Sequence, residues 1–247
     1  MADSGNSEEM GVVPHRFYIP EGTPASPYRA TPKRPAAHGP EHTFQYRWLK
    51  RALDLLLVFA CLPVLIPAIA LIALAIRVTS PGPIFFSHRR IRGHGSFFSM
   101  WKFRTMCVNS AEVLENYLAA NPEARAEWKK DHKLKADPRV TKLGEFLRRT
   151  SLDELPQVWN VLGGSMSLVG PRPIVAAEVE KYGEFFSDYC AVKPGVTGLW
   201  QVSGRSRISY AERVQMDRHY AGTWSLAGDL RILGRTLSSV VNQDGAY

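Results

Sequence analysis

Residues 55–76 read LLLVFACLPVLIPAIALIALAI, an uncharged run in which nearly every side chain is apolar. At about 1.5 Å per residue in a helix, the run is long enough to cross a hydrocarbon core roughly 30 Å thick. A membrane segment is therefore the element from which the rest of the fold is predicted.

Two features of this segment favour a bend over a straight span. Pro63 and Pro67 lie near its middle, where each removes a backbone donor and clashes with the carbonyl four residues back. Cations also flank both ends, whereas a spanning helix has its excess of Lys and Arg on one side. They are Arg47, Lys50 and Arg51 before the run and Arg77, Arg89, Arg90 and Arg92 after it. We predict that residues 44–80 form a re-entrant helix–bend–helix on the cytoplasmic face, with a kinked spanning helix as the alternative.

The composition limits the kinds of partner. A net charge of +8 in 247 residues points to nucleic acid, a phosphorylated small molecule or an acidic membrane surface. Three widely spaced cysteines argue against a disulfide framework. The sequence contains neither a CxxC nor an HExxH motif, so a structural zinc site is not expected. The first 43 residues are rich in Gly, Pro and Ser without periodicity, which predicts a disordered cytosolic tail.

The remainder, residues 81–247, is predicted to be a compact cytosolic domain of mostly helical α+β class. A Ser80–Pro83 break precedes strands near residues 84–86 and 97–106, the small β element, with a basic loop at 88–95. Helices are predicted from Ser110, from Pro122, and up to Arg149. Further amphipathic helices are expected at 174–191, 210–220 and 226–241, the last suited to lying on a bilayer surface.

The most informative polar stretch, SLDELPQVWNVLGG at 151–164, begins with two adjacent carboxylates. Ser151 to Glu154 matches a capping box, and Asp153 as the N-cap would instead place Pro156 in the first turn. Helix capping is thus the simpler interpretation. In both registers the spacing predicts a buried apolar stripe. Its members are Leu155, Val158, Trp159 and Leu162.

The same residues also suit phosphate chemistry. A carboxylate at a helix N-terminus is stabilised as the anion, and an ionised Asp153 could act as a nucleophile. Glu154 could help hold a divalent cation, while Arg148 and Arg172 could clamp phosphates. A serine hydrolase and a P-loop nucleotidase are excluded, because neither G-x-S-x-G nor G-x-x-x-x-G-K-[ST] occurs.

Several linked motifs resemble one known family. In chain order they are Lys50-Arg-x-x-Asp54, Ser80-Pro-Gly-Pro83, Lys102-Phe-Arg-Thr-Met106, Asp137-Pro-Arg-Val-Thr141, Ser151-Leu-Asp-Glu-Leu-Pro156, Met166-Ser-Leu-Val-Gly-Pro-Arg-Pro173, Lys193-Pro-Gly-Val-Thr-Gly198 and Leu199-Trp-Gln-Val-Ser-Gly-Arg205. Residues 46–247 are similar to the bacterial sugar transferases, the monotopic polyprenyl-phosphate phosphoglycosyl transferases. They most resemble the short ExoY-type proteins of exopolysaccharide synthesis.

The resemblance implies transfer of a sugar 1-phosphate from a UDP-sugar to undecaprenyl phosphate, with release of UMP, at the cytoplasmic face of the bacterial inner membrane. The sugar would be a hexose, galactose or glucose. Asp153 would form a covalent aspartyl-phosphosugar intermediate, and Glu154 would assist both it and Mg²⁺. Residues implied to bind substrate are Arg148, Arg172, Lys102, Arg104, Gln201 and Arg205. The membrane helix would bend at Pro67.

Two positions depart from the family pattern, and alternatives stay open. Ile66 replaces a serine before the bend proline, and Ser165 replaces an acidic residue before Met-Ser. The rival hypothesis is a non-catalytic membrane-anchored scaffold that binds anionic lipid. Nucleic acid is disfavoured because the sequence offers no stacked aromatic platform. A homodimer and the identity of the sugar are left open by the sequence.

Overall fold

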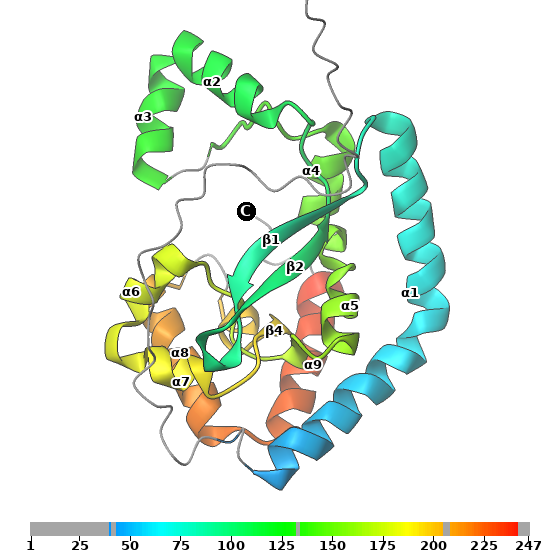
Figure 1. Cartoon of the computed structure of the whole chain (residues 1–247), viewed down its shortest axis with the longest axis vertical. Coiled ribbons are helices and arrows are strands. Elements are labelled where there is room, and N and C mark those ends of the chain that lie inside the picture. The colour runs from blue at the N-terminus through cyan, green and yellow to red at the C-terminus, as the bar shows by residue number, and fades with distance from the viewer. Residues whose placement is uncertain (1–39, 41–42, 132–133, 205–207, 242–247) are drawn as a thin grey trace, which may run out of the picture.

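The computed structural model describes residues 40, 43–131, 134–204 and 208–241, and it is mostly helical with two small sheets (Figure 1). The predicted α+β class is therefore confirmed at this level. Almost all of the predicted tail, and Arg205, lie outside the described residues, so those predictions stand untested.

The N-terminal region is one long apolar helix. A π-helical turn at Gln45–Lys50 leads into α1, Arg51–Thr79, which contains both Pro63 and Pro67. Figure 1 shows α1 changing direction part way along without splitting into two helices. The continuous Gln45–Thr79 segment is long and apolar enough to cross a membrane. Several of its large side chains face outward, including Leu56, Val64 and Leu71, so the apolar surface that membrane contact requires is present.

Two strands form a hairpin after the Ser80–Pro83 break. Strand β1, Phe85–Ile91, pairs antiparallel with β2, Phe97–Phe103, so that Phe85 is opposite Phe103. His88, Arg89 and Arg90 therefore belong to β1, and the basic loop is shorter than predicted. A second sheet pairs β3, Ser167–Val169, in parallel with β4, Gly195–Thr197.

The helices of the domain mostly follow the sequence signals. They are α2 Ser110–Ala120, α3 Pro122–Asp131, α4 Lys142–Arg149, α5 Gln157–Leu162, α6 Val179–Tyr182, α7 Phe186–Cys190, α8 Tyr210–Thr223 and α9 Leu226–Val241. The prediction of one helix over 174–191 was wrong. Gly183, at φ 52°, lies between α6 and α7, and short 3₁₀ turns replace a continuous helix.

Helix α1 contributes side chains to the hydrophobic core. Val58, Ile69 and Ile76 pack in one buried cluster with residues of the hairpin and of α4 and α5, among them Phe103 and Leu147. Near the start of α1, Asp54 accepts hydrogen bonds from the Ser167 hydroxyl (3.0 Å) and the Leu168 N–H (3.1 Å). At its other end, Arg104 donates to the Ser80 hydroxyl (3.1 Å). Both ends of α1 are therefore attached to the same domain.

Candidate active site

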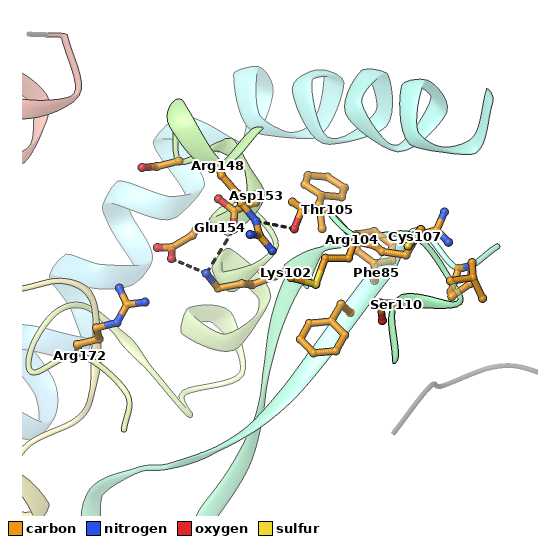
Figure 2. Close-up of a pocket in the computed structure, with 16 residues that line it drawn as sticks. Phe85, Lys102, Arg104, Thr105, Cys107, Ser110, Arg148, Asp153, Glu154 and Arg172 are labelled. Carbon is orange, nitrogen blue, oxygen red and sulfur yellow. Dashed lines mark hydrogen bonds and ion pairs between the residues drawn. The ribbon is translucent and has the colours of Figure 1, made fainter. Parts of the chain in front are cut away.

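A cavity of about 390 Å³ lies between β2, the end of α4 and the turn before α5 (Figure 2). Six of the predicted site residues line it: Lys102, Arg104, Arg148, Asp153, Glu154 and Arg172. Gln201 does not line it. Its side chain donates to the Val196 carbonyl (3.3 Å), so its role in substrate binding stays a prediction.

The two carboxylates are presented by a tight turn between α4 and α5. Ser151 has a positive φ of 57°, and a 3₁₀ turn over Leu152–Glu154 follows before Pro156. Short polar residues tolerate this left-handed conformation better than branched ones, although its cost marks the position as constrained. The reversal brings both carboxylates to face strand β2.

Neither carboxylate caps a helix, and the capping prediction was wrong. Both instead meet the ammonium of Lys102, with Nζ 3.3 Å from Asp153 Oδ2 and 2.6 Å from Glu154 Oε1. Helix α5 starts without a side-chain cap. The predicted buried stripe holds for Val158 but not for Trp159, which is 44% exposed. Asp153 and Glu154 therefore form ion pairs with Lys102 of strand β2 and do not cap helix α5.

Burial and nearby charge shift the two carboxyl pKa values in opposite directions. Burial raises the pKa of Asp153, and the attraction of Lys102 only partly opposes it. Burial would also raise the pKa of Glu154, but Lys102 and Arg172 outweigh it and hold that pKa below its ordinary value. The lowering expected for Asp153 at a helix N-terminus is therefore not found.

The arginines around the carboxylates have different surroundings. Arg148, in the last turn of α4, donates from Nε to the Thr105 hydroxyl (2.9 Å). Arg104 bonds the end of α1, which commits its guanidinium there. Arg172 forms no hydrogen bond or ion pair within the described parts of the chain, and Figure 2 shows it on the Glu154 side of the dyad. Of the three, Arg172 is the most available to an incoming anion.

Strand β1 adds cations that the sequence motifs did not single out. The pKa of Arg90 is lowered by burial and then by the charge of Arg172, so the two guanidiniums lie within electrostatic reach. Arg90 Nε and His88 Nδ1 are buried and lack a hydrogen-bond partner among the described residues. Both fall in the segment that the sequence predicts to be a basic loop. Their alternation along a strand was the signal that could have placed Arg90 and His88 on one face.

The donor set of Asp153 and Glu154 decides whether they could hold Mg²⁺. No group of three or more His, Cys, Asp and Glu side chains that could hold a metal occurs in the described part of the chain. Mg²⁺ is commonly held by one or two carboxylates together with substrate phosphates and water. Asp153 and Glu154 fit that pattern, and Lys102 now occupies the position between them that suits a cation.

The two departures from the family pattern lie outside this cavity. Ile66 is 52% exposed on α1. Ser165 follows α5, where its hydroxyl donates to the Asn160 carbonyl and accepts from the Asn160 amide, each at 3.2 Å. Ser165 therefore does not remove a ligand from the neighbourhood of Asp153.

Comparisons with known proteins show the family of this chain. Residues 45–243 match the model of the family described as bacterial sugar transferase. A UDP-galactose-lipid carrier transferase of Erwinia amylovora is 49% identical over 81% of this chain, and an undecaprenyl-phosphate galactose phosphotransferase of Salmonella typhimurium is 50% identical over 81%. This chain spans only 42% of the length of each. The exopolysaccharide production protein ExoY of Sinorhizobium fredii is 45% identical over 80% of this chain and 88% of its own length.

Proposed function

Because this chain belongs to the bacterial sugar transferase family, we propose that it transfers a hexose 1-phosphate from a UDP-sugar to undecaprenyl phosphate and releases UMP. The relatives' names, which include galactose and glucose phosphotransferases of undecaprenyl phosphate, support the reaction class. The observation that carries the proposal is the Lys102-bridged pair of Asp153 and Glu154, facing a cavity that Arg148 and Arg172 also line.

The proposed chemistry has two displacements at one phosphorus atom. An Asp153 carboxylate oxygen attacks the phosphorus that bears the sugar, the bond from that phosphorus to the UMP phosphate oxygen breaks, and UMP leaves with the electron pair. A phosphate oxygen of the lipid then attacks the same phosphorus, and the acyl phosphate bond breaks to return the carboxylate. Each step exchanges one phosphate linkage for another, so positioning and charge neutralisation supply most of the catalysis.

Individual residues have separate tasks in this scheme. Lys102 orients Asp153 and neutralises charge beside it, and the depressed pKa of Glu154 keeps that carboxylate ionised. Arg148 and Arg172 offer guanidiniums to the diphosphate. Mg²⁺, held by Asp153 and Glu154, would supply further charge neutralisation when bound.

We further propose that α1 is re-entrant and keeps the domain on the cytoplasmic face of the inner membrane. The long apolar helix and the family membership together indicate membrane association. The attachment of Asp54 to Ser167 at one end, and of Ser80 to Arg104 at the other, supports the finer topology. A helix that crossed the bilayer would have its ends on opposite sides, where they could not both contact one domain.

The proposed activity is tested by measuring UMP release from a panel of UDP-hexoses, with purified protein and undecaprenyl phosphate in detergent. Asp153→Asn is expected to abolish release because the amide is not a competent nucleophile. The matched control Asp188→Asn changes a carboxylate of α7 that pairs with Arg218, and should retain activity. Full activity in Asp153→Asn would refute the mechanism. No UMP from the wild type with any UDP-hexose would favour the scaffold.

The topology is tested separately, by labelling a cysteine introduced at Ser26 with a membrane-impermeant maleimide. Labelling is expected only after spheroplasts are lysed. Labelling of intact spheroplasts would overturn the re-entrant arrangement.

A further inference from the structure

A second cavity, of about 560 Å³, lies at the opposite end of α5 from the dyad. Its walls come from the first turns of α1, the tip of the β1–β2 hairpin, the loop after α5 and the segment before β4. Five cations line it together with one carboxylate: Arg47, Lys50, Arg51, Arg92 and Lys193, with Asp54. It shares no lining residue with the candidate active site.

Protein groups satisfy some of these charges. Lys50 is buried and pairs with Asp229 at 2.6 Å. Arg51 caps the end of α5, where it donates to the carbonyls of Val161 and Leu162. Asp54 accepts its hydrogen bonds from β3, as described above. These groups build the walls of the cavity, whereas Arg47, Arg92 and Lys193 form no ion pair with any residue that the structure describes.

Lys193 is the clearest unsatisfied charge. Its ammonium has no hydrogen bond or ion pair to any residue that the structure describes. Burial and the charge of Arg51 lower its pKa, and the attraction of Asp54 only partly opposes them. Arg92 uses Nε to bond the Ser96 hydroxyl (2.8 Å), which leaves its two terminal nitrogens for another acceptor. Cations held together at this density favour an anion between them.

The surroundings indicate where that anion would come from. Phe44 and Trp48, 71% and 62% exposed, lie on the same helical turns as Arg47 and Arg51. Through the Lys50–Asp229 pair the cavity also adjoins α9, whose Leu230 and Leu237 are 53% and 71% exposed. Exposed tryptophan and leucine beside lysine and arginine are typical of a surface at the level of lipid head groups.

We propose that this second cavity binds the phosphate of an anionic membrane lipid, apart from the lipid phosphate that reacts at Asp153. The inference rests on the membrane placement of α1 proposed above. Lys193 and Arg92 provide the phosphate contacts, and the aromatic and leucine side chains beside the cavity contact the acyl region. Such a lipid would fix the height of the hairpin tip and the end of α5 against the bilayer.

Native mass spectrometry of full-length protein released from nanodiscs tests the proposal. In discs of phosphatidylcholine with one quarter phosphatidylglycerol, the wild type is expected to retain one phosphatidylglycerol preferentially. Lys193→Gln should weaken retention about fivefold, the usual effect of one basic residue on an anionic lipid. Ser165→Asp should do the same, because Ser165 lines the cavity and a Cβ added to the adjacent Gly164 would lie 3.8 Å from the Lys193 ammonium. A carboxylate at this edge of the cavity would therefore compete with the lipid phosphate.

Controls separate this site from the reaction and from a general charge effect. Lys129→Gln removes an exposed lysine of α3 and should retain lipid like the wild type. Asp153→Asn should also retain it, so a failure of the proposed transferase activity would leave this result intact. Equal retention by wild type, Lys193→Gln and Ser165→Asp would overturn the proposal.

A second arm distinguishes lipid from free phosphate. In lipid-free detergent, inorganic phosphate is compared with chloride at equal ionic strength by the thermal midpoint. Suppose that phosphate stabilises the wild type but not Lys193→Gln, while phosphatidylglycerol is not preferred in discs. That result would assign the cavity to a soluble phosphate and overturn the lipid assignment.

Discussion

Replacing Lys102 with methionine removes the cation that both site carboxylates share, while keeping a side chain of similar length. Lys102 Nζ lies 3.3 Å from Asp153 Oδ2 and 2.6 Å from Glu154 Oε1, and all three side chains are largely buried. The variant leaves two adjacent carboxyl groups with no charge between them. We therefore expect the folded state to lose stability at neutral pH.

The size of the loss can be bounded in two ways. Removing one partner of a buried ion pair typically costs about 3–5 kcal/mol. The protein can instead protonate one carboxyl group. With the ordinary pKa of 4.5 for Glu154 and 1.36 kcal/mol per pH unit, protonation costs about 3 kcal/mol at pH 7 and about 1 kcal/mol at pH 5. The cheaper route sets the result. We expect a loss of about 3 kcal/mol at pH 7 that shrinks toward about 1 kcal/mol at pH 5.

Urea unfolding in a mild detergent at both pH values measures this loss. Lys142→Met, at an exposed lysine that starts α4, is the matched control and should change little. Lys102→Met should also bind Mg²⁺ more tightly in calorimetry, because the position between the carboxylates is vacated. A loss below about 1 kcal/mol at pH 7, with no change between pH 7 and pH 5, would refute the reasoning.

Two further predictions concern groups that hold the domain together. Burial raises the pKa of Asp217 to about 7. Between pH 4 and pH 7 the folded state therefore holds a proton that the unfolded state has lost. The free energy of unfolding should fall as the pH rises through this window, by an amount on the order of 4 kcal/mol. Asp217→Asn, which can still accept from Tyr182, should remove this slope in urea titrations across the window, and an unchanged slope would contradict the assignment. Gly144→Ala would place its Cβ 2.1 Å from the Thr105 carbonyl oxygen, so α4 must shift away. We expect the free energy of unfolding to fall by about 1–3 kcal/mol. UMP release should also fall, because Arg148 on α4 donates a hydrogen bond to Thr105. Gly234→Ala meets nothing within 4 Å and should be neutral or slightly stabilising, and equal behaviour of the two alanine variants would count against the close contact.

Local signals in the sequence predicted much of the secondary structure. The Asn121-Pro122 step separates α2 from α3, and α8 and α9 begin where the polar and apolar pattern suggested. The long apolar run and its two prolines predicted α1 and its bend. These features depend on residues close together in the chain, for which periodicity and proline chemistry are direct evidence.

The features that could not be predicted from the sequence depend on contacts between residues far apart in the chain. Lys102 and Asp153 are 51 positions apart, and only the docking of β2 against the α4–α5 turn joins them. Their ion pair displaced the predicted cap. The site residues were predicted from the family resemblance. The local pattern around the two carboxylates alone favoured helix capping. Arg90 was missed because its relation to Arg172 depends on the hairpin register and the Pro173 segment.

The packing of α1 into the core has a consequence for how this protein is made and handled. Val58, Ile69 and Ile76 supply one side of the cluster that Phe103 and Leu147 complete. A chain that starts at Phe85 would lack that side of the core, so we expect residues 85–241 to fold poorly without α1. During synthesis α1 leaves the ribosome before the segments that pack on it, so these segments must fold onto a helix already at the bilayer. Because α1 packs directly against the helices and strands that carry Lys102, Asp153 and Glu154, the proposed site is held at a fixed orientation to this helix.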